Sequence, residues 1–187
     1  MARADAVLTA LQYQISKFAN HLKATYSTSA DDIALNSSYH IEPFDETAIE
    51  SFAPTLGKSN YSLIVTRFDV KPRSDYPVGF LNQIYKADII VVRKSLRAKD
   101  RTNDRNLIQF GGTDDAGNDV TSIERICNDM QKWFRSYSQG GRLTDSTTAE
   151  NAFKCDITAI STLAKTGEFY YKVCSFECYT QETVTIS

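Results

Sequence analysis

The stretch YKADIIVVRKSLRAKDRTNDR, residues 85–105, joins an apolar segment to a run of cations. Its first half contains ADIIVV, an almost continuous apolar run that is typical of a strand buried on both faces of a sheet. We therefore expect a central strand over residues 84–92. Charged side chains dominate the second half, which predicts a loop of about 13 residues without secondary structure of its own.

Further strands are expected on both sides of this segment. YSLIVTRFDVKP is rich in β-branched residues and predicts a strand over residues 61–70 that Pro72 closes, forming a hairpin with the central strand. A short strand is expected over residues 106–110, before a Gly-Gly pair. The C-terminal third contains two long β runs, residues 153–164 and 168–186, joined at KTGE, a short hairpin signal.

Two segments carry the helical period. Residues 5–23 place apolar side chains at steps of three and four: Leu8, Leu11, Ile15, Phe18 and Leu22. Residues 120–137 do the same through Val120, Ile123, Cys127, Met130, Phe134 and Tyr137. Thr121 and Glu124 stand at capping-box spacing before this second helix, and the glycines of SQGGR suit its C-terminal end.

The order of these elements predicts an α+β fold. We expect one domain over residues 1–187, with a mainly antiparallel sheet, two amphipathic helices packed on one face, and long charged loops. The hydrophobic share of 42% and the charged share of 24% are those of a folded globular chain. No apolar run approaches the roughly 20 residues that span a bilayer, and the first residues lack the features of a signal peptide. We therefore expect a cytosolic protein, or one assembled in the cytosol.

The cysteines are expected to be reduced. Four are present, at positions 127, 155, 174 and 178. Cys174, Phe176 and Cys178 alternate along one expected strand, as small buried hydrophobic residues do. A zinc site is the alternative, but the C-x3-C spacing is unsuitable and His21 and His40 lie far away in the sequence.

The segment GGTDDAGND, residues 111–119, permits two interpretations. Its oxygen-bearing side chains could bind a hard cation, and they are Asp114, Asp115, Asn118 and Asp119. The spacing is not that of an EF-hand, and the same residues suit a turn that precedes a helix. The turn is the favoured interpretation, so we expect no metal and no cofactor.

The sequence contains no motif of catalysis. G-x-S-x-G, H-E-x-x-H and P-loop patterns are all absent, and neither histidine has a recognisable partner motif. We therefore expect a protein that is not an enzyme.

Opposite charges are segregated into two polar segments. The first is basic, with a local charge of +4, and its cations are Arg93, Lys94, Arg97, Lys99, Arg101 and Arg105. The second is acidic and contains no cation between Lys23 and Lys58; its carboxylates are Asp31, Asp32, Glu42, Asp45, Glu46 and Glu50. A head-to-tail assembly could use this arrangement, one subunit's basic arm reaching its neighbour's acidic loop.

Two other interpretations of these charges stay open. Both loops could simply be solvated, as charged runs usually are. The basic residues 93–105 could also contact nucleic-acid phosphates, although the segment lacks aromatic side chains for base stacking. A net charge of −2 argues against a dedicated nucleic-acid binder.

The order of elements, read through AVLTALQYQISKF, YKADIIVVRKS, IERICNDMQKWFRSY and FYYKVCSFECYT, resembles the tail terminator or tail completion proteins of tailed bacteriophages. The resemblance implies a structural virion protein that forms a homohexameric ring, caps the tail tube and joins it to the head–tail connector. It implies assembly in the host cytoplasm, DNA only as cargo through the bore, and no membrane. Other neck or baseplate adaptors, and a nucleic-acid-associated accessory protein using residues 93–105, are the alternatives.

Overall fold

The computed structural model describes residues 2–26, 34–35, 49, 61–65, 69–72, 80–96, 101–117, 119–137, 142–144, 147 and 150–183. Its helices are α1 (Ala2–Thr25), α3 (Arg101–Phe110) and α4 (Ile123–Lys132), and α4 continues into the π-helical segment η2 (Trp133–Tyr137). Its strands are β1 (Ala34–Leu35), β2 (Tyr61–Val65), β3 (Asp69–Pro72), β4 (Phe80–Lys94), β5 (Gly112–Thr113), β6 (Asp119–Val120), β7 (Leu143–Thr144), β8 (Glu150–Ile160), β9 (Ala164–Thr166) and β10 (Phe169–Thr183). None of the described helices is long and apolar enough to cross a membrane.

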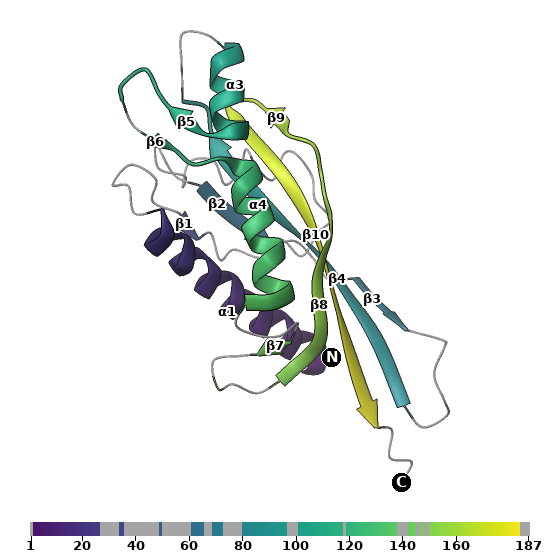
Figure 1. Ribbon diagram of the computed structural model, residues 1–187. Coiled ribbons are helices and arrows are strands. Elements are labelled where there is room, and N and C mark those ends of the chain that lie inside the picture. The colour runs from purple at the N-terminus through teal and green to yellow at the C-terminus, as the bar shows by residue number, and fades with distance from the viewer. Residues whose placement is uncertain are drawn as a thin grey trace.

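Two long antiparallel strands, β4 and β10, form the centre of the sheet (Figure 1). They pair over their whole length, from Phe80 opposite Thr183 to Lys94 opposite Phe169. The strand order is β1-β2-β4-β10-β8-β7, with β3 also on β4 and β9 also on β10. Only the short β1–β2 pair is parallel among the described pairs. The predicted α+β class and the central position of residues 84–92 are therefore confirmed.

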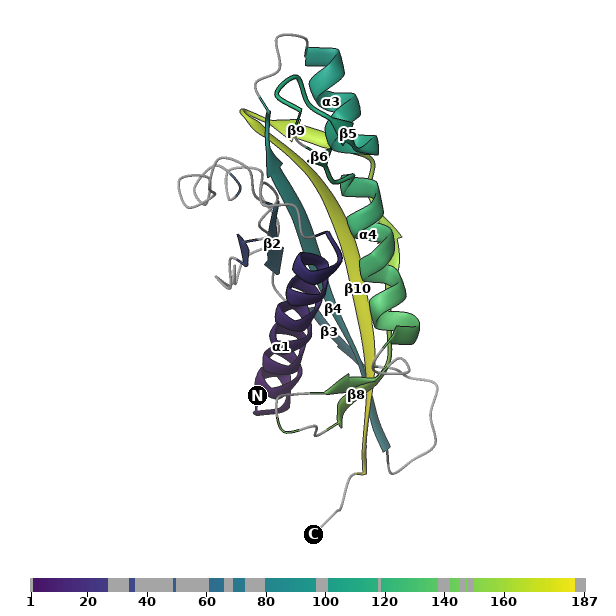
Figure 2. The same cartoon turned by 60° about the vertical axis from the view of Figure 1, so that its left-hand side comes forward.

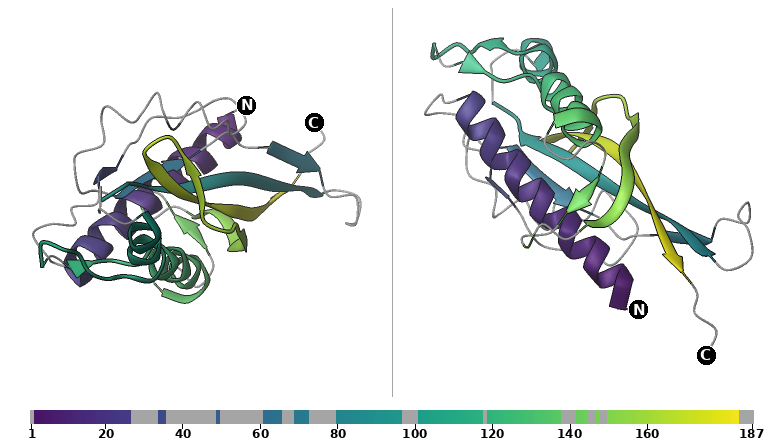
Figure 3. Two further views of the ribbon diagram at one scale, coloured as in Figure 1. Left: turned by 90° about the horizontal axis from the view of Figure 1, so that it is seen from above. Right: turned by 60° about the horizontal axis from the view of Figure 1, so that its bottom comes forward.

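The main core lies between α1, α4 and one face of the sheet (Figures 2 and 3). Phe18 of α1 packs against Trp133 with ring centres 5.8 Å apart, and Phe134 packs against Phe176 of β10 at 4.9 Å. All three helical side chains are buried. The prediction that two amphipathic helices share one face of the sheet is thus confirmed.

The opposite face of the sheet has a core of its own. Ile64 and Ile90 belong to a second buried cluster with Ile49, which lies in the segment before β2. Ile90 and its neighbours Ile89, Val91 and Val92 are each exposed by 1% or less. The continuous apolar run of β4 is therefore explained by burial on both faces.

The basic segment does not have the structure predicted for it. β4 extends to Lys94, and residues 101–110 form helix α3 instead of a loop followed by a short strand. Asp104, Leu107 and Ile108 are buried and lie on one side of this helix, at steps of three and four. The sequence hid this period because one of the three buried positions is an aspartate.

The predicted strand over residues 61–70 is divided into β2 and β3. Both pair with β4, Val65 opposite Ile89 and Asp69 opposite Lys86. The β2–β3 segment advances four positions from Val65 to Asp69, while β4 advances only three from Ile89 to Lys86. The ladder therefore cannot be continuous. Residues 66–68 lie outside the described part of the chain.

The C-terminal hairpin is confirmed. β9 and β10 are joined by Gly167 and Glu168, with Thr166 opposite Phe169. Gly167 has a φ of 50°, a left-handed conformation that glycine adopts without steric cost. The tight turn therefore needs a glycine at this position.

Candidate assembly interface

The basic segment begins with two cations that serve the sheet. The Arg93 side chain is 2% exposed, and its guanidinium lies 4.6 Å from the centre of the Tyr61 ring. Lys94 places its Nζ 3.2 Å from the Glu168 carboxylate in the hairpin turn. These interactions lie within the fold, so Arg93 is not presented to a partner.

Two of the remaining cations of the basic segment belong to α3. Arg101 is the first residue of the helix, and Arg105 is exposed on it, whereas Arg97 and Lys99 lie outside the described residues. Asp104 fixes the helix to the end of β4, because its carboxylate accepts hydrogen bonds from the Leu96 amide at 2.9 Å and the Ser95 hydroxyl at 2.5 Å. Six residues, 95–100, separate the end of β4 from the helix, and of these 97–100 lie outside the described residues. The predicted loop of about 13 residues without secondary structure is therefore wrong, and the role of its cations in an interface stays a prediction.

The acidic residues predicted to face this segment cannot be placed. Asp31, Asp32, Glu42, Asp45, Glu46 and Glu50 all lie outside the described residues. The proposed contact between acidic and basic segments thus stays a prediction.

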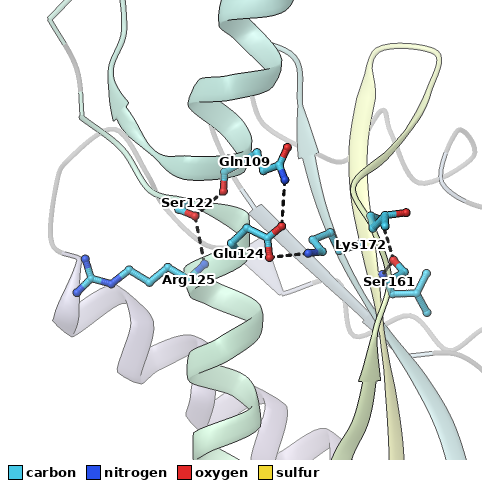
Figure 4. A network of polar contacts seen from close by, with 8 residues as sticks. Gln109, Ser122, Glu124, Arg125, Ser161 and Lys172 are labelled. Atoms are coloured by element: carbon cyan, nitrogen blue, oxygen red, sulfur yellow. Dashed lines mark hydrogen bonds and ion pairs between the residues drawn. The ribbon is translucent and has the colours of Figure 1, made fainter.

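A polar network joins α3, α4 and β10 (Figure 4). Ser122 is the N-cap of α4: its hydroxyl accepts from the Arg125 amide at 3.2 Å and donates to the Gln109 carbonyl at 2.5 Å. Glu124 points instead toward Lys172, whose Nζ lies 2.6 Å from Oε2. The Gln109 side chain donates to the same carboxylate at 3.3 Å.

The predicted capping box is therefore wrong by one residue. Thr121 precedes the cap, and its carbonyl accepts the hydroxyl of Tyr61. Glu124 is held by the buried ammonium of Lys172 on the sheet and does not turn back to the helix start. The competing ion pair across the core explains the difference.

A groove of about 520 Å³ opens beside this network, between the end of α1, the β5–β6 turn and the start of α4. Phe110 lines it and is 68% exposed. Arg125 lies over the Tyr26 ring at 4.9 Å, and the Tyr26 hydroxyl donates to Asp129 at 2.5 Å. Burial, together with the hydrogen bond to Asp129, raises the pKa of Tyr26 to about 12.

The GGTDDAGND segment forms a turn between β5 and β6. The Asp114 carboxylate accepts from the Ala116 amide at 2.9 Å, and the Asp114 carbonyl accepts from the Gly117 amide at 2.9 Å. Asn118 lies outside the described residues. Among the residues that the structure does describe, no three His, Cys, Asp or Glu side chains form a group able to hold a metal ion.

All four cysteines are buried thiols. Contact with Cys174 and burial both raise the pKa of the Cys127 thiol far above its usual range. The alternation predicted for the C-terminal strand is confirmed, because Cys174, Phe176 and Cys178 are all fully buried on β10.

A three-stranded ribbon is made of β3 (Asp69–Pro72), the start of β4 (Phe80–Lys86) and the end of β10 (Glu177–Thr183). This ribbon extends away from α1 and α4 in Figures 1 and 3. Asp69 and Lys71 of β3 are exposed, and Val70 keeps 41% of its surface exposed. Strand β3 therefore contributes little to either core.

Charged and aromatic side chains stabilise one face of the ribbon. Asp69, Lys86 and Glu177 occupy one row across β3, β4 and β10, and the Lys86 ammonium contacts the Glu177 carboxylate. The hydrogen bond to Glu177 raises the pKa of Lys86. Lys154 of β8 lies over the ring of Tyr179, with Nζ 5.3 Å from its centre.

Both edges of the ribbon are open within the described part of the chain. On one side, β3 pairs with β4 alone. On the other, β8 follows β10 only as far as Phe153 opposite Tyr179 and then pairs with β7. Lys154 adopts a φ of 53°, a left-handed conformation at an irregularity in this ladder, one residue from the last described pair of β8 with β10. Residues 180–183 of β10 consequently have a described partner on the β4 side only.

No pattern in the sequence predicts these edges directly. The one available indication was length, because residues 168–186 form a longer β run than any neighbour that could pair with them. Open edges depend on where a neighbouring strand departs, and here the last described pair is that of Phe153 with Tyr179, next to the irregularity at Lys154.

The chain was also compared with known proteins. No protein-family model matches it, and no curated protein sequence matches it.

Proposed function

We propose that this chain is a structural subunit that assembles with copies of itself, and that the assembly is the ring of a bacteriophage tail terminator. In this role it caps the tail tube and joins it to the head–tail connector. The observation that carries the proposal is the β3–β4–β10 ribbon, which extends from a well-packed body and whose two outer edges have no partner strand among the described residues.

Open strand edges favour assembly for a simple chemical reason. An unpaired edge presents backbone N–H and C=O groups in the spacing that another strand needs, so it is a template for a further strand. Natural proteins usually cover such edges or keep them short. A subunit with edges on both sides of one ribbon can bind a neighbour on each side, which is the requirement for a ring.

The virion role rests on the resemblance in element order. Four elements of that order are present in the described residues: a long first helix, a central strand pair, a second helix on the same face and a final hairpin. The acidic loop lies outside the described residues, and the long excursion expected after the central strands contains helix α3 instead. Another position in the neck or baseplate would use the same self-association, so it is a variant of this proposal.

The nucleic-acid alternative is weaker than the sequence suggested. Arg93 is buried against Tyr61, and Lys94 is paired with Glu168. Two of the six cations of the basic segment therefore have internal partners. Phosphate steering would depend on the other four.

Light scattering over a wide range of protein concentration, with negative-stain images of the same samples, tests the proposal. We expect closed rings of about six subunits. A monomer at every concentration, together with DNA affinity that falls steeply with salt, would contradict the ring and favour the accessory role. DNA binding should be titrated at several salt concentrations on the same preparation, so that both functions are compared directly.

A further inference from the structure

The direction of the ribbon strands limits how two copies can join. β3 and β10 each pair antiparallel with β4, so they run in the same direction at opposite edges of the ribbon. Rotation about a ring axis moves a copy of β3 next to β10 without reversing it. A ring built through these edges must therefore contain a parallel joint between β10 of one subunit and β3 of the next.

The two open edges share one level only, so a joint between them must be staggered by two to four residues along the strands. Pro72 of β3 is opposite Gln83, and Gln83 is opposite Thr180, where the open part of β10 begins. Each edge offers about the same short length of strand. Pro72 has no N–H, so it ends the ladder on the β3 side and restricts the joint to the residues before it.

The faces of the ribbon fix the register further. Val70 is opposite Tyr85, and Tyr85 is opposite Cys178, so these residues share a face with Thr180. A continuous sheet must keep faces together, because a slip of one residue turns every side chain to the other face. Thr180 is only 1% exposed in the single chain, so Val70 of one subunit must lie beside the next position on the same face of its neighbour, residue 182.

We propose that each subunit adds its β3 edge (Asp69–Pro72) in parallel to the open edge of its neighbour's β10, residues 180–183, so that the ribbons form one continuous sheet around the ring. This inference rests on the proposed function and names the surface and the partner of that assembly: a second copy of this chain. A joint of about three residues is weak alone. Closure of the ring strengthens the assembly, because every subunit is then bound to a neighbour on both sides. The ring is thus stable where a single pair of subunits is not.

Cysteine cross-linking tests the joint, because the four native cysteines are buried and should not react. The double variant Val70→Cys/Glu182→Cys, treated with a short bismaleimide, should give a ladder of linked species that ends at the size of the ring. Val70→Cys and Glu182→Cys alone should stay unlinked. The matched control Val70→Cys/Thr162→Cys carries its second cysteine at an exposed position between β8 and β9, and it should also stay unlinked.

The outcomes separate this inference from the proposed function. Dimers from either single variant would show like edges pairing antiparallel, which overturns the parallel joint. Rings in light scattering with no cross-link in the double variant would leave the ring standing and overturn the joint. Absence of any assembly by the wild-type chain would overturn both. If the first double variant fails to assemble, Lys71→Cys/Gln181→Cys probes the same joint, and an intact but unlinked ring in that variant also overturns it.

Discussion

The ion pair between Glu124 and Lys172 should respond very differently to loss of its two members. The Lys172 side chain is 5% exposed, while that of Glu124 is 31% exposed. Replacing Glu124 with Gln leaves a buried ammonium without its counter-charge. Removing one member of a fully buried ion pair lowers the free energy of unfolding by about 3–5 kcal/mol. Partial solvent access to Glu124 reduces the expected loss to about 2–3 kcal/mol here.

The opposite change should be much milder. Lys172→Met fills the same buried space with an apolar side chain, and the Glu124 carboxylate can then turn to water while it keeps the Gln109 amide. We expect a loss of about 1 kcal/mol or less. The double variant Glu124→Gln/Lys172→Met should have nearly the same free energy of unfolding as Lys172→Met alone. The two side chains then have a coupling free energy of about 2 kcal/mol.

Urea unfolding followed by circular dichroism measures these differences, with every variant at one protein concentration so that assembly contributes equally. Losses of equal size for the two single variants would refute the reasoning, because they would mean that both charges are equally solvated. A loss below about 0.5 kcal/mol for Glu124→Gln would mean that the pair is not formed across the core at all.

Four further predictions follow from the core and the strand geometry. Phe134→Ala should lower the free energy of unfolding by about 3–5 kcal/mol, because its buried ring packs against Phe176, and a loss below about 1 kcal/mol in urea would show that the helix face is wrongly assigned. Lys154→Gly should leave stability unchanged or raise it by up to about 1 kcal/mol, whereas Lys154→Val should lower it by about 1–2 kcal/mol; equal midpoints for the two would exclude a left-handed residue there. The fold raises the pKa of Tyr26 from 10.0 to about 12, so the stability linked to its proton is complete below pH 10 and is lost as the pH rises toward 12. The urea midpoint of Tyr26→Phe should therefore fall less over that interval than the midpoint of the wild type. Parallel plots of midpoint against pH for the two proteins would contradict the shift. The cysteines should react with Ellman's reagent only in urea, and fast reaction of the native chain would place at least one of them at the surface.

Apolar periodicity predicted most of the fold. The buried stripe of α1, including Leu11 and Phe18, and the fully buried run of β4 follow directly from it, because both bury many side chains at a regular spacing. The period-2 burial of β10 is equally regular. Such elements can be predicted from sequence because burial requires apolar side chains at a regular spacing. The spacing is every second residue in a strand and every third or fourth residue in a helix.

Elements whose stability comes from specific polar contacts were not predictable in the same way. Helix α3 has Asp104 at a buried position, where it accepts hydrogen bonds from the end of β4, so its apolar pattern is incomplete. Glu124 has the spacing of a capping partner, yet Lys172, distant in sequence, holds it instead. In both cases a contact between remote segments overrides the local pattern.

The candidate interface depended even less on local sequence. Cations counted along the chain suggested a basic arm, but Arg93 and Lys94 are used inside the fold. The open edge of β10 exists because β8 departs near Lys154, and a single residue in a left-handed conformation leaves no periodic trace. Charge runs and strand edges need the three-dimensional arrangement before they can be assigned to a surface.

The central claim is that this chain closes into a ring with copies of itself. Native mass spectrometry of the wild-type protein over a range of concentrations tests it most directly, because it counts subunits. We predict one dominant assembly of fixed size, about six subunits, whose mass does not grow with concentration. A monomer throughout, or a series of sizes that lengthens without limit, would contradict it.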